Sequence, residues 1–332
     1  MDSSRRGASM AGIWVLVEHF RGEVQEITYE MLGAGRELAD QLRIPLQAVV
    51  LGHNGEGLCQ SLGAADSVLA VEVPSGRELI PEGCVQVLGP LLQERTPKAL
   101  LIGNTNVGLG LGSLLSATLS LPFVNFCRAL SVRDGRIVAT SVLYGGKIEA
   151  EVSPAGEPAI YGISPGICPA ERGRSDRSPP IERIPAPPLG ESRVEFKAYM
   201  EPEPGDIDIT KMNVLVAVGR GIQRQENVAL AEELAQVLGG AVCASRPVVD
   251  QGWLPLSRQV GRSGVRVKPK LYLAAGISGA PEHVEGMKQA ALIIAINTDP
   301  GAPIFHVAHY GIVGDAVEIL PALTAAVRER RR

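Results

Sequence analysis

The chain has 332 residues, of which 45% are apolar and only 4% aromatic, with 38 glycines and 24 prolines. This much apolar material excludes a chain that is disordered throughout, and the length predicts two domains. The glycine content without a G-X-Y period excludes collagen and indicates many tight turns. Basic residues number 32 and acidic residues 36, so the net charge is −4 and the chain lacks the basic field that wholesale nucleic-acid binding requires.

The chain ends, the cysteines and the histidines give no sign of a membrane, secreted, disulfide-bonded or metal-binding protein. No apolar run is long enough to span a membrane and residues 1–12 lack the apolar part of a secretory signal, so we expect no membrane insertion and a cytoplasmic location. The five cysteines are scattered without a C-x-x-C pair, which predicts buried thiols in a reducing compartment. The basic run 328–332 predicts a solvated, fraying tail. His306 and His309 lack an acidic or cysteine cluster, so we expect packing or surface histidines and no metal site.

The first half of the chain predicts a mostly parallel sheet with helices between the strands. Its short apolar runs predict strands at 13–17, 46–51, 67–73 and 99–102. Amphipathic stretches between them predict helices at 28–42 and 82–94. A meander of further strands is expected at 129–132, 136–141, 147–152 and 159–163.

Proline density interrupts this pattern over residues 164–204. Such density disfavours regular helix and sheet interior, so an extended linker is expected, with an edge strand at 194–199 as the one exception. The expected domains are therefore 10–190 and 207–332, joined by a proline-rich linker at 191–206.

The second domain repeats a strand–turn–helix scheme, which predicts a doubly wound sheet with its ligand at the carboxyl ends of the strands. Its strands are expected at 213–218, 271–275 and 292–296, with a helix at 226–238. The fold class predicted for the whole chain is thus α/β in two domains, of which the second is Rossmann-like.

The turns that follow these three strands indicate a shared nucleotide crevice. They are 219–221, 276–280 and 297–303. Glycines let a backbone approach a diphosphate, and a helix N-terminus adds N–H donors and partial positive charge. Because Arg224 breaks the dinucleotide motif, the first turn taken alone is equally a plain tight turn. The glycine-rich stretch 108–113 of the first domain lacks the acidic residue of that motif, and close packing of a helix on a strand is expected there.

Ordered blocks of sequence across residues 212–323 carry a specific resemblance to a known family. They are 219–221 (GRG), 245–252 (SRPVVDQG), 259–261 (QVG), 268–272 (KPKLY), 276–280 (GISGA), 295–297 (AIN), 302–305 (APIF) and 311–315 (GIVGD). Together they resemble the C-terminal FAD domain of the electron transfer flavoprotein alpha subunit. The first domain resembles the same family more thinly, through 14–18 and 144–146.

This resemblance implies a cofactor, partners and a function. FAD is expected in the second domain, and a heterodimer with the electron transfer flavoprotein beta subunit, which the first domain contacts. Single electrons are expected to pass from acyl-CoA or other dehydrogenases, as in fatty acid β-oxidation, to a membrane quinone oxidoreductase. The positions expected to contact FAD are Arg220, Ser245, Arg246, Gln259, Val260, Gly261, Arg262, Ser263, Ser278, Gly279, Ala280, Pro281, Glu282, His283, Asn297, Asp315 and Ala316.

Three of these positions are expected to tune the flavin potential. The resemblance implies that Arg246 lies against the isoalloxazine, that the Ser263 hydroxyl donates toward N5, and that His283 lies near the O2 carbonyl. A cation about 4 Å from the added negative charge is worth roughly 4 kcal/mol at an effective dielectric constant of 20. Arg246 is therefore expected to set the potential.

Several departures from the family pattern leave functional alternatives open. Pro281 and Glu282 stand where the family has Ile-Gln, which predicts a flavin that is harder to reduce unless Arg262 compensates. In the first domain, Ser141 and Val142 replace an Arg-Pro pair. An electron-bifurcating complex that oxidises NADH with two FADs is the alternative function, and an NAD-using transferase is a remote one.

Overall fold

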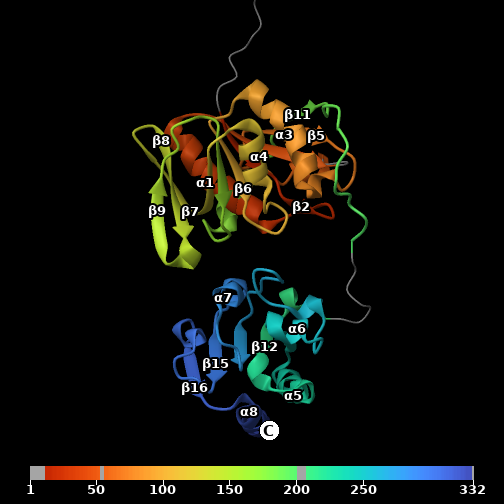
Figure 1. Ribbon diagram of the computed structural model, residues 1–332, viewed down its shortest axis with the longest axis vertical. Helices are drawn as coiled ribbons and strands as arrows, with labels where there is room; N and C mark the ends of the chain where they lie inside the picture. Colours follow the sequence, from red (N-terminus) through yellow and green to blue (C-terminus); the bar gives the residue numbers. More distant parts are fainter. Residues whose placement is uncertain (1–11, 53–55, 200–206, 331–332) are drawn as a thin grey trace, which may run out of the picture. The chain divides into compact units, whose positions relative to one another are not determined.

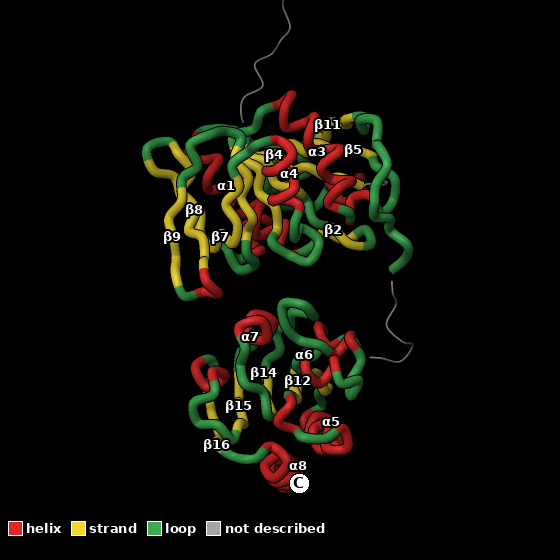
Figure 2. Tube along the Cα trace, in the orientation of Figure 1, coloured by secondary structure: helices red, strands yellow, loops and turns green. Residues whose placement is uncertain are grey.

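The polypeptide folds into two units, Met1–Ala198 and Tyr199–Arg332, each built on its own sheet (Figure 1). The computed structural model describes residues 12–52, 56–199 and 207–330. In each sheet the strands lie side by side between helices, as Figure 2 shows. The two-domain α/β class expected from the sequence is confirmed.

Unit 1 contains a nine-stranded sheet in the order β11-β5-β4-β1-β6-β10-β7-β8-β9. The strands are β1 (Ile13–Leu16), β4 (Leu46–Gly52), β5 (Ser67–Glu72), β6 (Ala99–Gly103), β7 (Phe123–Arg133), β8 (Arg136–Leu143), β9 (Ile148–Val152), β10 (Ala159–Ile163) and β11 (Ile181–Ile184), and β2 (His19–Phe20) and β3 (Glu23–Val24) form a separate hairpin. The helices are α1 (Glu26–Leu42), α2 (Glu56–Cys59), α3 (Pro81–Arg95) and α4 (Leu111–Leu119).

Alternate residues of the central strands serve two separate cores, one on each face of this sheet. Ile13 and Val15 of β1 belong to the core that α1 covers with Met31 and Leu32. Trp14 and Leu16 belong to the opposite core, which contains residues of α3 and α4. Each large side chain that is fully buried contributes roughly 1.5–3 kcal/mol. Burial on both faces is the reason that these strands appear as continuous apolar runs in the sequence.

Three expectations for unit 1 were wrong. Strand β10 does not continue the meander, because it lies between β6 and β7 and is parallel to both. Part of the proline-rich stretch is also regular: β11 extends the sheet by pairing in parallel with β5. The reason is that Ile181–Ile184 itself contains no proline, so its backbone can pair with the open edge of β5. The edge strand expected at 194–199 is not formed.

The chain between β10 and β11 also packs tightly on α1. A Cβ at Gly173 would lie 1.9 Å from the Tyr29 carbonyl oxygen, so backbone meets backbone here. The Cys168 thiol donates to the Glu30 carbonyl oxygen at 3.1 Å. This part of the expected linker is therefore bound to unit 1, and residues 200–206 lie outside the described residues.

Unit 2 contains a five-stranded parallel sheet in the order β13-β12-β14-β15-β16. The strands are β12 (Val214–Val218), β13 (Ala241–Ala244), β14 (Leu271–Ala275), β15 (Ile293–Asn297) and β16 (Tyr310–Val313). The helices are α5 (Val228–Leu238), α6 (Arg246–Asp250), α7 (Pro281–Met287) and α8 (Ala316–Arg330). From β12 the chain goes to β13 on one side and then to β14 on the other, so the topological switch point lies between β12 and β14.

The expected fraying tail was wrong for residues 328–330. Helix α8 continues to Arg330, and the Arg328 guanidinium lies 2.8 Å from the Glu233 carboxylate of α5. Leu320 of α8 and Leu234 of α5 share one buried core, which fixes the two helices on the same face of the sheet. Residues 331–332 lie outside the described part of the chain.

Candidate functional site

The carboxyl ends of the five strands of unit 2 gather the residues expected from the sequence. Arg220 follows β12, Ser245 and Arg246 follow β13, and Asp315 follows β16. The stretch 278–283 follows β14 and Asn297 ends β15. Parallel strands place their carboxyl ends at one edge of the sheet, so these positions share an edge although they are spread over almost 100 residues of sequence.

The turns after β12 and β14 interlock at the switch point. The Gly219 amide donates to Ala275 and the Gly221 amide to Gly276, at 2.9 and 3.0 Å. A Cβ at Gly219 would lie 2.3 Å from the Gly276 carbonyl oxygen, and Gly276 has a φ of +66°. These glycines are therefore required for the contact between the two turns, which leaves Arg220 exposed at the tip of the first turn.

A tight turn over residues 259–265 forms the next part of this edge. The Val260 amide donates to the Ala244 carbonyl at 2.9 Å, which ties the turn to β13. Inside the turn, the side-chain Nε2 of Gln259 donates to the Ser263 hydroxyl at 3.0 Å. The Arg262 amide donates to the Glu282 carbonyl at 2.7 Å and so joins the turn to the start of α7. The side chains of Arg262 and Ser263 remain exposed.

His283 is buried at 6% exposure beneath this turn, and both of its ring nitrogens have partners inside unit 2. Nδ1 lies 3.1 Å from the Val260 carbonyl oxygen, which can only accept, so Nδ1 carries the hydrogen. Nε2 lies 2.9 Å from the Tyr272 hydroxyl and accepts from it. Burial lowers the pKa of His283 to about 4, so the ring is neutral at pH 7.

The expected position of His283 beside the flavin O2 carbonyl stays a prediction, although both ring nitrogens have partners inside unit 2. As the third residue of α7 it points into the core, whereas Pro281 and Glu282 before it are exposed. The ring connects β14, the 259–265 turn and α7, and in this arrangement it has no N–H left for a ligand. Sequence reasoning missed Tyr272, although a tyrosine inside an apolar strand needs a partner for its hydroxyl.

Two exposed ion pairs provide the charge at this edge. The Arg246 Nε lies 3.3 Å from the Asp250 carboxylate, and the arginine side chain is 68% exposed. The Arg262 Nη2 lies 3.7 Å from the Glu282 carboxylate. Exposed pairs of this kind are worth about 0–1 kcal/mol, so either guanidinium can turn to an anionic ligand at little cost.

The side chains of Asn297 and Asp315 form hydrogen bonds with neighbouring loops of unit 2. The Asn297 side chain donates to the Ile277 carbonyl at 2.9 Å, across the β14 and β15 turns. One Asp315 oxygen accepts from the Val317 amide at 2.8 Å and thereby caps α8. The other accepts from the Gln223 side chain at 2.9 Å. These two positions, expected to contact the cofactor, thus hold neighbouring turns together, and Gln223 was not foreseen.

The groups exposed at this edge match the chemistry of FAD. The guanidinium groups of Arg220, Arg246 and Arg262 can pair with a diphosphate. The exposed hydroxyls of Ser263 and Ser278 can donate to the acceptor atoms of a flavin ring. The N-termini of α6, α7 and α8 lie at the same edge and add backbone N–H donors. The residues present therefore fit the cofactor.

The corresponding edge of unit 1 is closed by its own chain. A cavity of about 30 Å³ lies at the carboxyl ends of β1 and β6, and Glu18 and Glu78 are among the residues that line it. A Cβ at Gly108 would lie 2.0 Å from the Gly103 carbonyl oxygen, which confirms the close packing expected for the glycine-rich stretch. Two carboxylates and so small a volume do not suit a nucleotide diphosphate.

The part of the chain that the structure describes contains no candidate for a membrane span or a metal site. None of its helices is both long and apolar enough to cross a bilayer, and no group of histidine, cysteine and acidic side chains could hold a metal ion. The five cysteines are thiols, four of them buried and Cys168 half-buried.

Comparison with known proteins gives matches along nearly the whole chain. The model of the electron transfer flavoprotein domain matches residues 13–189, and that of the electron transfer flavoprotein FAD-binding domain matches residues 208–288. Protein FixB of Clostridium saccharobutylicum is 36% identical over 328 residues, covering 97% of this chain and 98% of the relative. The electron transfer flavoprotein subunit alpha of Clostridium acetobutylicum is 36% identical over 331 residues, with coverages of 97% and 98%. Protein FixB of Azotobacter vinelandii is 38% identical over 331 residues, covering 96% and 91%.

Proposed function

Because the chain belongs to the electron transfer flavoprotein alpha-subunit family, we propose that it binds one FAD at the carboxyl edge of unit 2 and works as a heterodimer with the beta subunit. In this role it passes single electrons from acyl-CoA or other dehydrogenases to a quinone oxidoreductase. The convergence of three exposed guanidinium groups and two hydroxyls on one sheet edge is the observation that carries the proposal. The scattered thiols favour a reducing compartment, and we expect the cytoplasm.

The exposed residues of this edge have separate roles in the proposal. Bound FAD supplies the one-electron chemistry, and the protein supplies orientation and charge. Arg246 offsets the negative charge that reduction adds to the isoalloxazine, and Ser263 donates its hydroxyl toward N5. The buried His283 acts indirectly, because it fixes the turn that carries Arg262 and Ser263.

The Arg262–Glu282 pair modifies this electrostatic environment. A carboxylate at 282 opposes added electron density, whereas a guanidinium 3.7 Å away offsets most of that effect. Both side chains are more than half exposed, at 55% and 57%, so solvent screens the pair and its net effect on the potential is small.

For the beta subunit we propose a contact surface on unit 1, made of Phe126, Leu143, Tyr144 and Ile148. These apolar side chains are 39%, 40%, 77% and 50% exposed. Leu143 and Ile148 are cross-strand partners in β8 and β9, and Tyr144 follows directly in the chain. Phe126 and Tyr144 also have φ values of 52° and 51°, a conformation uncommon for bulky residues and often found at functional positions.

The decisive experiment is the flavin content of the co-purified heterodimer and its spectrum during stepwise reduction. One FAD per heterodimer that NADH does not bleach is expected. Two FADs that NADH bleaches would refute the carrier in favour of electron bifurcation, and a colourless protein that retains NAD would refute both. For the surface, Tyr144→Ser should weaken the heterodimer, whereas Tyr310→Ser, at a tyrosine 66% exposed on unit 2, should not.

A further inference from the structure

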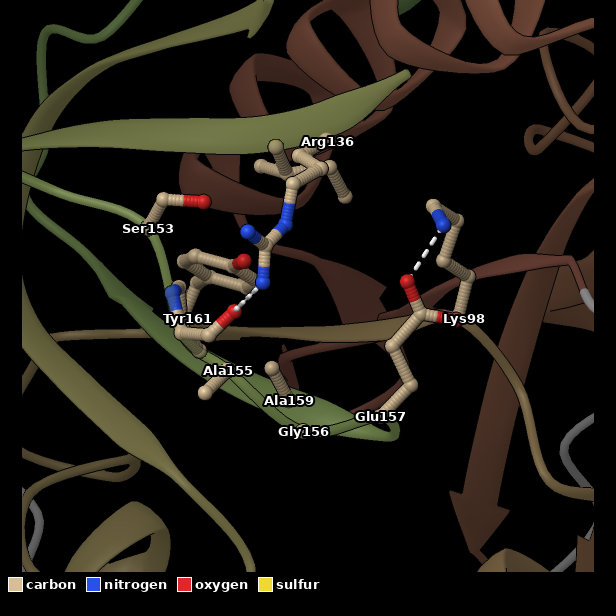
Figure 3. A pocket seen from close by; sticks show the side chains of 10 residues that line it. Lys98, Arg136, Ser153, Ala155, Gly156, Glu157, Ala159 and Tyr161 are labelled. Carbon is tan, nitrogen blue, oxygen red and sulfur yellow. Dashed lines mark hydrogen bonds and ion pairs between the residues drawn. The ribbon is translucent and has the colours of Figure 1, made fainter. Parts of the chain in front are cut away.

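Unit 1 contains a second cavity, at the opposite end of its sheet from β2 and the small cavity described above. It has a volume of about 100 Å³. Its walls are formed by Lys98, Arg136, Ile137, Ser153, Pro154, Ala155, Gly156, Glu157, Ala159 and Tyr161 (Figure 3). Lys98 directly precedes β6 and Ala159 begins β10, so the cavity lies at the amino ends of these parallel strands. A water molecule needs about 10–15 Å³ of such space, so this cavity holds several waters or one small organic ion.

Tyr161 provides a buried polar group at this cavity. Its side chain is only 2% exposed, and its hydroxyl forms no hydrogen bond with any residue that the structure describes. Burial raises the pKa of this phenol further above its ordinary value, so the hydroxyl is a donor at every physiological pH. This hydroxyl is not one of the fully buried side-chain atoms left without a partner, so a water or a ligand in the cavity can reach it.

Arg136 reaches into the same space from the first residue of β8. Figure 3 shows its guanidinium on the side of the cavity where Ser153 and Tyr161 lie. Among the residues that the structure describes, its hydrogen-bond partner is the Pro154 carbonyl oxygen, which accepts from Nη2 over a long distance of 3.4 Å. The remaining N–H groups of the planar Arg136 guanidinium are the donors best suited to a carboxylate.

The remaining charges of the cavity nearly cancel. Lys98 and Glu157 form an ion pair across the opening, with the lysine side chain 18% and the glutamate 55% exposed (Figure 3). Together with Arg136 the ionisable lining therefore carries one net positive charge. This charge favours a monoanion over a dianion, because a second negative charge would be left facing Glu157 without compensation.

We propose that this cavity binds a short-chain monocarboxylate. The Arg136 guanidinium pairs with the carboxylate, and the Tyr161 hydroxyl donates to one of its oxygens. The alkyl part lies against the apolar side chains of Ile137, Ala155 and Ala159. Propionate has five non-hydrogen atoms and fits the volume, whereas long-chain fatty acids do not.

Titration of the FAD-loaded heterodimer with sodium propionate, followed by isothermal calorimetry, tests the site. Saturable binding at one site per alpha chain in the millimolar range is expected. Propionamide, and phosphate at pH 8 where it is mainly a dianion, should bind at least tenfold more weakly at matched ionic strength. Propionamide lacks the negative charge, and the phosphate dianion carries one charge too many. Absence of saturable propionate binding, or equal binding of propionamide, would overturn the proposal.

Variants separate this site from a general effect of charge. Arg136→Gln should weaken propionate binding tenfold or more, and Tyr161→Phe severalfold, as expected for one charge-assisted and one ordinary hydrogen bond. Arg133→Gln is the matched control, since Arg133 lies in the same hairpin but pairs with Glu151 outside the cavity. Glu157→Gln should tighten binding by removing the opposing charge. Equal affinity in the Arg136→Gln and Arg133→Gln proteins would refute the assignment.

Discussion

His283 makes the stability of unit 2 depend on pH in a way that can be measured. Its pKa is about 4 in the folded chain, against about 6.5 for an exposed histidine. Between these values the unfolded chain binds a proton that the folded chain does not. The free energy of unfolding therefore falls as the pH drops below 6.5, whereas well above pH 7 this histidine adds no pH dependence.

The magnitude follows from the two pKa values. Lowering the pH from 7.5 to 5.5 should cost about 1 kcal/mol of unfolding free energy through this residue alone, and about 3 kcal/mol would be lost by pH 4. The interval above pH 5.5 is preferred because most carboxylates remain ionised there. The loss arises because burial disfavours the charged ring, and a protonated ring also has no lone pair to accept from the Tyr272 hydroxyl.

The variant His283→Asn isolates this contribution. Asparagine retains a donor near the Nδ1 position but does not titrate, and it leaves the Tyr272 hydroxyl without its acceptor. It should therefore be less stable than wild type at pH 7.5 by about 1–3 kcal/mol, and the difference should shrink by about 1 kcal/mol at pH 5.5. His306→Asn, which removes an exposed imidazole of the same unit, should leave the wild-type slope unchanged.

Urea unfolding of the full chain, followed by tryptophan fluorescence, provides the measurement. Trp253 is half-buried beside the core that α5 and α8 share, whereas Trp14 lies in unit 1. A Trp14→Phe background therefore leaves one reporter, and it belongs to unit 2. If the gap between wild type and His283→Asn stays constant from pH 7.5 to 5.5, within about 0.3 kcal/mol, the assignment of a neutral, buried imidazole is wrong.

Three other outcomes follow from the contacts of both units. Gly219→Ala places a Cβ 2.3 Å from a backbone oxygen and should cost about 2 kcal/mol in urea unfolding, while Gly57→Ala, with open space around it, should be nearly neutral. Glu282→Gln should raise the flavin potential by on the order of 30 mV against a reference dye, and Arg262→Gln should lower it by a similar amount. Burial raises the pKa of the Asp66 carboxyl, but hydrogen bonds and neighbouring arginines lower it by more, so the pKa is below its ordinary value. Asp66→Asn should therefore lower the free energy of unfolding by about 1 kcal/mol at pH 7, and the difference from wild type should vanish as the pH falls through the lowered pKa.

Most of the strands that the sequence predicted are central strands buried on both faces, although the exposed edge strand β9 was also predicted and the buried edge strand β13 was missed. β6 and β12 consist almost entirely of apolar residues because two cores need them. The edge strands β16 and β11 lack this requirement and were missed. β16 is largely exposed, and β11 has two charged residues between its two isoleucines and lies beside prolines. Their pairing depends on a neighbouring strand being available, which is a property of the tertiary fold and not of the segment.

The site divides in the same way between what the sequence could and could not predict. A doubly wound order places every βα turn at one edge, so the set of positions near the ligand follows from the strand pattern. The direction of each side chain does not. Whether His283 points outward to a flavin or inward to Tyr272 depends on how α7 packs on the 259–265 turn. The Asn297 side chain likewise donates to the Ile277 carbonyl of a neighbouring turn.

The side chains at the carboxyl edge of unit 2 form a buried set and an exposed set, and mutations in the two sets should have different effects. The buried or half-buried members, among them His283 and Asn297, bond one loop to another, so their loss should lower stability first and cofactor affinity only as a result. The exposed members Arg220 and Arg246 have little to lose in the folded chain, so their loss should alter FAD affinity or potential while urea unfolding of the cofactor-free chain stays unchanged. A screen that measures both quantities can therefore distinguish a ligand contact from a support for the loops, which neither quantity can do alone.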